Sequence, residues 1–518
     1  MLAKTPPRGL FSRFRDGVAR SLLYTAEYLG GGDSTQLLGF GLNGPNSSDG
    51  IEAGRAGRRL KNWNPSRVNL NTLMYSAGRT TLARARYLSR NNPYAVSAVD
   101  SFKSNLIGAG IVPTWKDERI SKLFEAWRPH ADSENVSDFF GFQRRVAGEL
   151  FVAGECFIRR RPRYLSDGFP VPLQLQIIPA EQLPIEYNML MANGNRVRQG
   201  VEYDKIGRRV AYHFWKVHPG DITQSQFLGQ KVIVPATEIL HIHDPIEAQQ
   251  IRGWSRLTPT IVTLFTLDLY DDAELERKKT AALFSLFVRR PDEEGQFFAD
   301  AMQKMEDKEQ ERDEVTLAPG SAQMLLPGED VTVANPADVG PNYDAFQYRN
   351  LTRVCAALGL PYAGVTGDHS RANYSSQRSA ILEMQRRFEA VQSSVMVHQL
   401  CRPIEAWFLQ AALLAAAVSL PQDGSPEILG SFERAGWIPP RWDWVDPLKD
   451  IQAEAEAVNN GFKARSQVIR EFGEDPVATD MAAAEDKKRQ DKLGLKFAAT
   501  EPKLPPQQGE PAKQKAET

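Results

Sequence analysis

The chain of 518 residues is long enough for about three domains of ordinary size, and its hydrophobic content of 42% allows a real buried core. A formal net charge of −1 argues against tight nucleic-acid binding through a globally basic surface, because such binding needs many phosphate contacts. Three cysteines, an odd number far apart in sequence, argue against a disulfide framework and a cysteine-based zinc site.

The first 54 residues are predicted to form an arm, basic and amphipathic at first and Gly-rich afterwards. Arg13, Arg15 and Arg20 interrupt its apolar positions, so it is not a secretory signal. Packing on a neighbouring molecule is the favoured interpretation, with membrane or nucleic-acid contact as the alternative. The most apolar run, 411–420, is about half of the ~20 residues that a transmembrane helix needs and therefore predicts a buried helix.

Residues 71–106 show helical periodicity that Asn92-Pro93 interrupts. From 148 to 234 the pattern changes to short β-rich runs between Gly, Pro and Asp turns, which predicts a mostly antiparallel β region. The predicted strands are 151–153, 156–158, 173–178, 197–203, 210–217 and 232–234. Within them, residues 200–214 read as a hairpin with its turn at 204–207.

A long helix is predicted from Pro259 to Pro291, about 50 Å in length. Its middle is unusual because acidic residues are followed at once by basic ones, while both ends are apolar. The charged residues are Asp268, Asp271, Asp272, Glu274, Glu276, Arg277, Lys278 and Lys279. Such a helix is expected to line a solvent-filled passage or to pack in a ring with copies of itself.

The polar insertion that follows is predicted to hold a charged helix at 297–312 and strands at 314–317, 322–326 and 330–333. Further helices are predicted at 342–358, 447–460 and 464–472, and the tail is predicted to be disordered from 496.

A polar loop, 359–376, lies between the helix 342–358 and a helix expected to begin with Ser375 or Ser376 as its N-cap. Its polar side chains are Asp368, His369, Ser370, Arg371, Asn373, Tyr374 and Ser375. Adjacent Asp, His and Ser residues do not have the geometry of a catalytic triad, whose members come from separate elements. The loop either contacts phosphates weakly or caps the following helix through its own backbone bonds.

The sequence contains no phosphate-binding loop, dinucleotide fingerprint, HExxH or GxSxG motif. The best metal candidate is His241 with His243 and Asp244, because alternate residues of a strand share one face. A third ligand is not evident nearby, so two histidines at the end of a structural strand is the favoured interpretation.

Several blocks resemble the portal proteins of tailed bacteriophages, in particular the lambda-type family. The blocks, which run in the family's order from about 55 to 490, are 84–111, 200–212, 249–257, 359–362, Asp368 with 373–376, and 444–449.

The resemblance implies an α+β portal fold assembled as a ring, usually a dodecamer, at one capsid vertex. Double-stranded DNA would pass through it without sequence specificity, both when terminase packages it and when it is ejected. By family order the parts are a wing (55–256 and 377–445), stem helices (257–290 and 341–358), a clip (291–340), a channel loop (359–376) and crown helices (446–495).

The expected partners are further copies of the chain, the terminase large subunit, capsid and scaffold proteins and head-tail connector proteins. The location expected is the virion, and the host cytoplasm during assembly, without a membrane. The resemblance also implies a protein with no cofactor and no enzymatic activity. Another structural head protein, such as a scaffold or minor capsid protein, is the first alternative, and a metal-dependent hydrolase using His241 and His243 is the second.

Overall fold

The computed structural model describes residues 65–115, 117–283, 287–289, 330–332, 342–418, 436–440 and 447–495. The chain divides into two units, 1–68 and 69–518, and every described helix and strand belongs to the second. The predictions for the arm 1–54, the helix 297–312, the strands 314–317 and 322–326, and the tail 496–518 lie outside the described residues.

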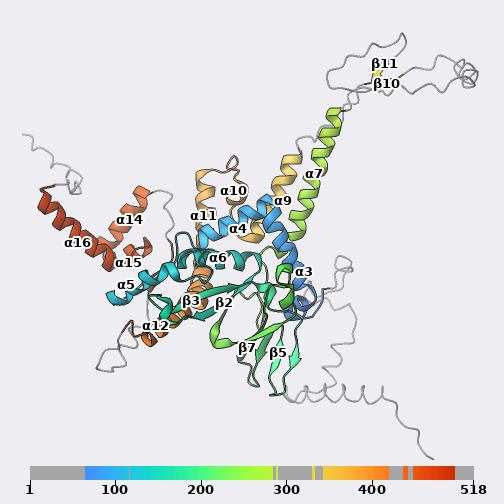
Figure 1. Ribbon diagram of the computed structural model, residues 1–518. Helices are drawn as coiled ribbons and strands as arrows, with labels where there is room; N and C mark the ends of the chain where they lie inside the picture. The colour runs from blue at the N-terminus through green and yellow to red at the C-terminus, as the bar shows by residue number, and fades with distance from the viewer. Residues whose placement is uncertain are drawn as a thin grey trace, which may run out of the picture. The chain divides into compact units, whose positions relative to one another are not determined.

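The described part combines helices with small antiparallel sheets, which confirms the α+β class (Figure 1). Its α-helices are α3 (Leu70–Asn91), α4 (Pro93–Leu106), α5 (Glu118–Trp127), α6 (Phe139–Val152), α7 (Ile261–Leu283), α9 (Asn342–Leu358), α10 (Tyr362–Thr366), α11 (Tyr374–Val391), α12 (Arg402–Leu414), α14 (Pro447–Asn459), α15 (Arg465–Glu471) and α16 (Pro476–Leu493). A π-helical segment, Gln392–Cys401, joins α11 to α12 without a loop.

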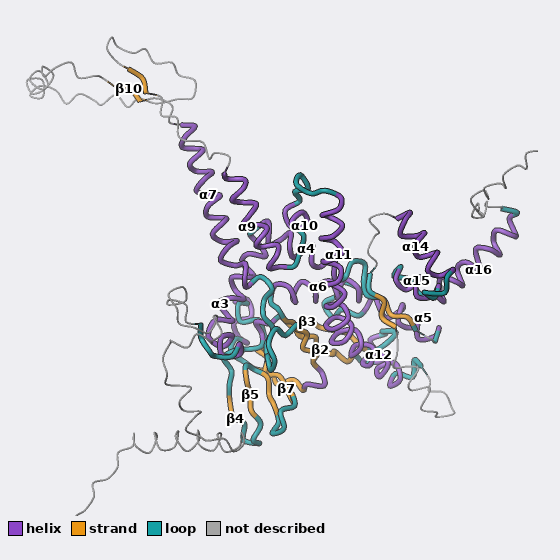
Figure 2. The backbone as a smooth tube through the Cα atoms, turned by 180° about the vertical axis from the view of Figure 1, so that it is seen from behind, coloured by secondary structure: helices purple, strands orange, loops and turns teal. Residues whose placement is uncertain are grey.

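The strands of the described part, drawn in orange in Figure 2, form four sheets. They are β1 (Val112–Thr114), β2 (Glu155–Pro162), β3 (Leu173–Ile178), β4 (Met189–Leu190), β5 (Arg196–Arg198), β6 (Val201–Tyr203), β7 (Arg209–Trp215), β8 (Lys231–Pro235), β9 (Ile239–His243), β10 (Phe287–Arg289), β11 (Asp330–Thr332) and β12 (Gly436–Ile438). The larger sheets have the orders β3-β2-β9 and β4-β5-β6-β7-β8, and all their pairs are antiparallel.

The sheet β3-β2-β9 separates two hydrophobic cores, because alternate residues of β2 point to opposite faces. Cys156 and Ile158 belong to the larger core, which is built mainly from helices. Phe157 belongs to the smaller core, where Tyr212 and Phe214 of the five-stranded sheet cover it. One short sheet therefore holds the helical layer and the β layer together.

The break predicted at Asn92-Pro93 is confirmed. Asn92 is fully buried, and its side-chain oxygen accepts a 2.8 Å hydrogen bond from the Ala95 N–H at the start of α4. Pro93 occupies the first turn, where the missing N–H costs nothing. The Asn92 amide also donates to Asp268 at 2.7 Å, so the break fixes the position of α7.

Two strand predictions are wrong. Residues 151–153 complete helix α6 and its C-cap, because Phe151 and Val152 continue the buried face of that helix until Gly154 leaves it at φ 82°. Residues 197–203 form two strands and not one, because Gln199 and Gly200 both adopt positive φ and turn the chain between β5 and β6. The hairpin predicted at 200–214 is confirmed as β6 and β7, with the Gly207 N–H bonded to the Asp204 carbonyl.

The helix predicted to reach Pro291 is too long. Helix α7 ends at Leu283, and residues 287–289 form strand β10, which pairs with β11. The backbone N–H and C=O groups of 287–289 therefore bond to β11 and not within a helix. Phe287 and Val288 are residue types that favour strands. The prediction of 342–358 as a helix is confirmed by α9, and the predictions 447–460 and 464–472 by α14 and α15.

The apolar run that begins at 411 belongs to α12, whose residues Ala411 and Ala412 are buried. Among the described helices, none combines the length and apolar character needed to span a bilayer. Cys156, Cys355 and Cys401 are buried free thiols, and burial raises the pKa of Cys355 to about 11.

Candidate functional site

Helices α7 and α9 run side by side, and polar and aromatic contacts join them (Figures 1 and 2). The Asp271 carboxylate accepts a 2.7 Å hydrogen bond from the Tyr343 hydroxyl and a second bond from the Gln347 amide. Tyr270 stacks on the Tyr343 ring at 5.8 Å and meets Phe346 edge-on at 5.4 Å. The bond to Asp271 and partial burial raise the pKa of Tyr343. The two helices are therefore fixed in register with each other.

The structure divides the predicted charged residues of α7 into two groups. Asp268 and Asp271 accept hydrogen bonds from the α3–α4 break and from α9 of their own chain, so both carboxylates are held in place within the chain. Glu274 pairs with Arg277 at 2.6 Å on the same helix, and its side chain is only 12% exposed. The exposed members are Asp272, Glu276, Arg277, Lys278 and Lys279, and Glu276 pairs with Lys279 at 2.7 Å.

A second face of α7 is apolar and exposed. Val262 is 72%, Phe265 49% and Leu269 53% exposed, and their spacing of three and four residues places them in one row. No described part of the chain covers this row. An exposed row of large apolar side chains on a helix marks a surface that contacts another molecule.

The predicted loop 359–376 is shorter than expected, because α10 occupies 362–366 and α11 begins at Tyr374. The predicted N-cap at Ser375 or Ser376 is wrong. Asn373 caps α11 by accepting a 2.8 Å bond from the Ser376 N–H, and Ser376 reciprocates by accepting from the Asn373 N–H at 3.2 Å. The capping alternative is thus realised by Asn373, which leaves 367–372 as the loop proper.

The other polar residues of this loop differ in how they are held. Arg371 forms an ion pair with Asp344 of α9, and its guanidinium lies 4.2 Å from the centre of the Tyr348 ring. His369 Nδ1 lies 2.9 Å from the Gln377 amide nitrogen. Ser370 donates its backbone N–H to Asp368 at 2.9 Å. Arg371 thus attaches the loop to the α7–α9 pair.

The predicted site residues His369, Ser370, Arg371, Asn373, Tyr374 and Ser375 are all exposed to solvent, and Tyr374 has 56% of its surface accessible. These residues lie near the start of α9, where Arg371 pairs with Asp344, and they present polar and aromatic groups to solvent. The geometry contains no nucleophile and base held by a third group, as a triad requires.

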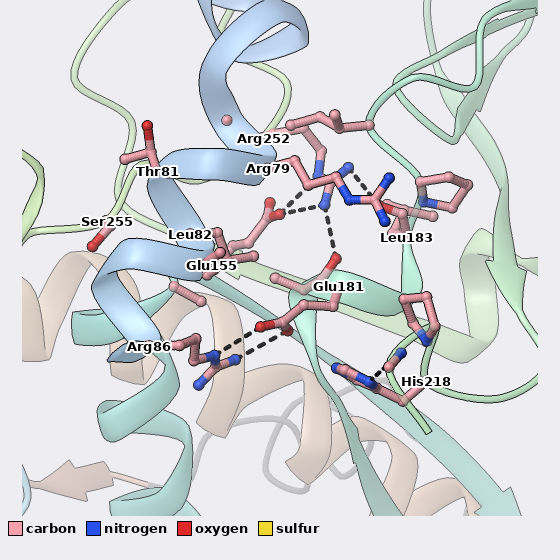
Figure 3. Close-up of a pocket in the computed structure, with 18 of the residues that line it drawn as sticks. Arg79, Thr81, Leu82, Arg86, Glu155, Glu181, Leu183, His218, Arg252 and Ser255 are labelled. Carbon is pink, nitrogen blue, oxygen red and sulfur yellow. Dashed lines mark hydrogen bonds and ion pairs between the residues drawn. The ribbon is translucent and has the colours of Figure 1, made fainter. Parts of the chain in front are cut away.

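A buried joint precedes α7 and explains the sequence block 249–257. Arg252 is 2% exposed and donates to the Glu155 carboxylate at 2.8 Å and to the backbone carbonyls of Leu183, Gln199 and Ala180 at 3.0–3.1 Å. The charge and all the bonding directions of this guanidinium are used within the chain (Figure 3). Arg252 therefore ties the segment before α7 to both sheets.

The backbone at this joint is closely packed. A Cβ at Gly253 would lie 2.2 Å from the Gly154 carbonyl oxygen, and a Cβ at Gly154 would lie 2.2 Å from the Trp254 backbone. The Gly253 N–H donates to Glu155 at 2.7 Å. Only glycine fits at both positions, so the close approach brings β2 and the segment before α7 into direct backbone contact.

His241 is part of the same network and not of a metal site. Its Nε2 lies 2.9 Å from Glu155 and its Nδ1 3.4 Å from Arg209, which suits a neutral ring that donates to the first and accepts from the second. Burial lowers the pKa of His241 to about 3, against the opposing effect of Glu155. Burial would raise the pKa of Glu155, but Arg252 and His241 outweigh it and lower that pKa.

The His243 ring stacks on His241 at 4.4 Å and does not converge with it on a common point. Asp244, the carboxylate of the metal candidate, pairs with Arg256 at 2.7 Å. Among the described residues, no group of three or more His, Cys, Asp or Glu side chains is placed to hold a metal ion. In the described part of the chain, His241 and His243 are therefore better interpreted as residues of a structural strand than as metal ligands.

A cavity of about 770 Å³ lies between α3 and the segments around Ile185 and Trp254 (Figure 3). Charged pairs frame it. Arg86 binds Glu149 at 2.6 Å and Glu181 at 2.8 Å, and Arg79 binds Glu186 at 3.2 Å. Two arginines meet three glutamates in these pairs, so the charges that frame the cavity are engaged within the chain, as at a structural junction.

The joint residues Glu155 and Arg252 were not identified as a pair from the sequence, although the block 249–257 was. The signal available was an arginine next to a glycine, Arg252-Gly253, between the apolar residues Ile251 and Trp254. Its partner lies 97 positions away, which local patterns do not reveal.

Comparisons with known proteins agree with this architecture. The model of a family described as phage portal protein, lambda family, matches residues 56–392. A probable portal protein of Halomonas phage phiHAP-1 is 26% identical over 82% of this chain and 83% of its own length. Portal protein B of Escherichia phage lambda is 21% identical over 81% of this chain and 85% of its own. A chain from the neck of an empty GTA particle matches 76% of this chain and 93% of its own with 17% identity and a TM-score of 0.43, which by itself carries no argument.

Proposed function

The chain belongs to the lambda family of phage portal proteins and serves the portal function at the capsid vertex, and from this premise we propose how its parts perform that function. We propose that copies of the chain assemble as a ring in which α7 and α9 form the wall of a DNA channel. The observation that carries this proposal is the exposed row Val262, Phe265 and Leu269 on α7.

In a single chain these three side chains face water, although burying each would contribute about 1.5–3 kcal/mol. The α7 helix of a second copy, packed against the row, removes this exposure for every subunit of a closed ring. The face that joins α7 to α9 inside one chain is a different one, occupied by Tyr270 and Asp271. One helix can therefore pair within its chain and across the ring at the same time.

The exposed charges Asp272, Lys278 and Lys279 are proposed to face the channel. Asp272 repels the phosphates of a DNA backbone at short range while the lysines attract them, and salt screens both effects beyond a Debye length of about 8–10 Å. The proposed effect is low friction for a duplex that must move without being held. The loop 367–372, with exposed His369 and the neighbouring Tyr374, is proposed to contact the same duplex through its phosphates, without sequence preference.

The proposed partners beyond further copies are the terminase large subunit, the major capsid and scaffold proteins and the head-tail connector proteins. We propose a location in the virion after assembly in the host cytoplasm. The family is structural, and the proposal gives the chain no enzymatic step and no cofactor.

Ring assembly is tested with Phe265→Glu and Leu269→Glu, in the full chain, by light scattering and negative-stain electron microscopy. The expected result is a wild-type ring with a central hole and loss of the ring in either variant. A matched control is Ile206→Glu, because Ile206 is 76% exposed on the β6–β7 turn. A wild-type chain that stays monomeric under all conditions contradicts the proposal, as do α7 variants that assemble normally.

A further inference from the structure

Three arginines lie at alternate positions along the end of β2, namely Arg159, Arg161 and Arg163. Arg163 continues the ladder, since its N–H bonds to the Pro172 carbonyl at 2.9 Å. Alternate residues of a strand share one face. We propose that this arginine row is a docking surface for an extended acidic segment of a partner protein, with carboxylates at every second position.

The row lies at the part of β2 that the five-stranded sheet no longer covers. Phe157, on the same face and two residues earlier, is fully buried under the five-stranded sheet. Arg159 and Arg161 are only half-buried, and Arg163 is exposed. The same strand face thus changes from a closed apolar core to an open cationic surface within a few residues.

Two of the arginines donate to neutral glutamine side chains, which orient the guanidinium groups without neutralising their charge. Arg161 Nε donates to Gln176 at 2.8 Å and Arg163 Nε donates to Gln174 at 2.8 Å. Among the described residues, the one carboxylate within ion-pair distance of the row is Glu238, at 3.6 Å from Arg159. Three cations therefore face one anion.

The like charges of the row lie close enough to affect one another. Burial, then the neighbouring charges of Arg159 and Arg163, lower the pKa of Arg161. In addition, Arg159 Nε is buried and has no hydrogen-bond acceptor. A bound anion relieves the repulsion among the three guanidinium groups, so the charges of the row are not balanced by the described residues of the chain itself.

The geometry favours an extended peptide as the anion. Alternate side chains of a strand are about 6.7 Å apart, and an extended peptide repeats its own alternate carboxylates at the same spacing. Guanidinium groups already oriented by glutamine bonds suit bidentate carboxylate binding. Tyr164 and Leu165, 79% and 70% exposed, follow the row at once and add the apolar contact typical of protein interfaces. The chain's net charge of −1 gives no wider basic field for DNA.

The test measures fluorescence anisotropy of a labelled peptide with glutamate at every second position, titrated with the full-length protein. A peptide of the same composition with its glutamates clustered at one end serves as comparison. We expect tighter binding of the alternating peptide, and a loss of about tenfold or more in the triple variant Arg159→Gln, Arg161→Gln and Arg163→Gln. Melting curves show whether the variant folds; if it does not, Arg163→Gln alone is expected to weaken binding.

The matched control is Arg196→Gln, Arg198→Gln and Arg208→Gln, which removes the same charge from the other sheet and is expected to bind like the wild type. The proposal is overturned if both peptides bind equally, if the control loses as much affinity as the row variant, or if duplex DNA binds more tightly than the peptide and loses its binding in the row variant.

Discussion

The Tyr343 hydroxyl donates a 2.7 Å hydrogen bond to Asp271 Oδ1 and so joins helix α9 to helix α7. Asp271 lies in the middle of the charged segment of α7 and next to exposed Asp272, yet the two adjacent carboxylates have different surroundings. One fixes the helix pair, and the other is open to solvent.

We predict that Tyr343→Phe lowers the free energy of unfolding by about 1 kcal/mol, because it removes this bond while keeping the ring contacts. Urea denaturation followed by circular dichroism measures the change. Tyr374→Phe is the control, since Tyr374 is 56% exposed on α11. Equal stability of the two variants contradicts the role given to Tyr343.

We predict that Asp272→Lys slows or stalls DNA packaging, because it removes the anion that offsets Lys278 and Lys279 and leaves three cations to hold the phosphates that must slide past. The measurement is the length of DNA packaged per particle over time. Glu118→Lys, on α5 with its carboxylate side chain 73% exposed, is the control with the same charge change. Normal packaging by Asp272→Lys would remove the support for a low-friction channel wall.

We predict that deleting residues 368–372 spares ring assembly and reduces DNA retention in filled particles. Asn373 must stay, because it caps α11, and its replacement by Ala is expected to cost about 1 kcal/mol of stability. Retention is measured by nuclease sensitivity of the packaged DNA. If the deletion leaves retention unchanged, the loop only closes the connection between two helices.

We predict that Glu155→Ala destabilises the protein by about 3–5 kcal/mol, because it leaves the Arg252 charge buried without its partner. Thermal or chemical denaturation measures the loss. The control Glu186→Ala breaks the exposed pair with Arg79 and is expected to cost less than about 1 kcal/mol. Similar losses of stability in both variants would show that the buried pair contributes no more than the exposed one.

We predict that the protein loses stability as the pH falls from about 6.5 towards 5. Folding lowers the pKa of His241 from 6.5 to about 3, so in this range the unfolded chain binds a proton that the folded chain does not. The free energy of unfolding then falls by up to about 1.4 kcal/mol per pH unit. Glu155, whose pKa is also lowered, adds to the loss only below its unfolded value of 4.5.

Urea titrations at several pH values test this dependence. His241→Gln keeps a donor for Glu155 and removes the titrating group, so we expect a flatter dependence than in the wild type. His369→Gln, in the exposed loop, is the control and should keep the wild-type slope. An unchanged slope in His241→Gln would mean that another group governs the acid response.

The sequence patterns predicted those elements whose signals are local. The Asn92-Pro93 break, the β6–β7 hairpin and helix α9 follow from capping, turn and periodicity rules that act over a few residues. The end of α7 was predicted too late along the chain, because β10 owes its conformation to pairing with β11. Strand β11 begins at Asp330, 43 positions after β10 begins at Phe287, so local patterns do not reveal the pairing.

The candidate site was predicted as a set of residues but not as an arrangement. The spacing of Asp268, Asp271 and Asp272 showed that they share a helix, and nothing local told which of them would meet Asn92 or Tyr343. In the same way, Asn373, Ser375 and Ser376 are all possible N-caps by residue type, and in the structure it is the side-chain Oδ1 of Asn373 that accepts from the Ser376 N–H.

The contact between Gly154 and Gly253 sets the clearance of the whole joint before α7. A single added methyl group must push the two backbones apart, and the displacement lengthens along a rigid helix of 23 residues. In a ring the same error is made by every subunit at once and in the same direction, so it cannot average out. If α7 lines the channel of the ring as proposed, the width of that channel depends on two positions that carry no side chain.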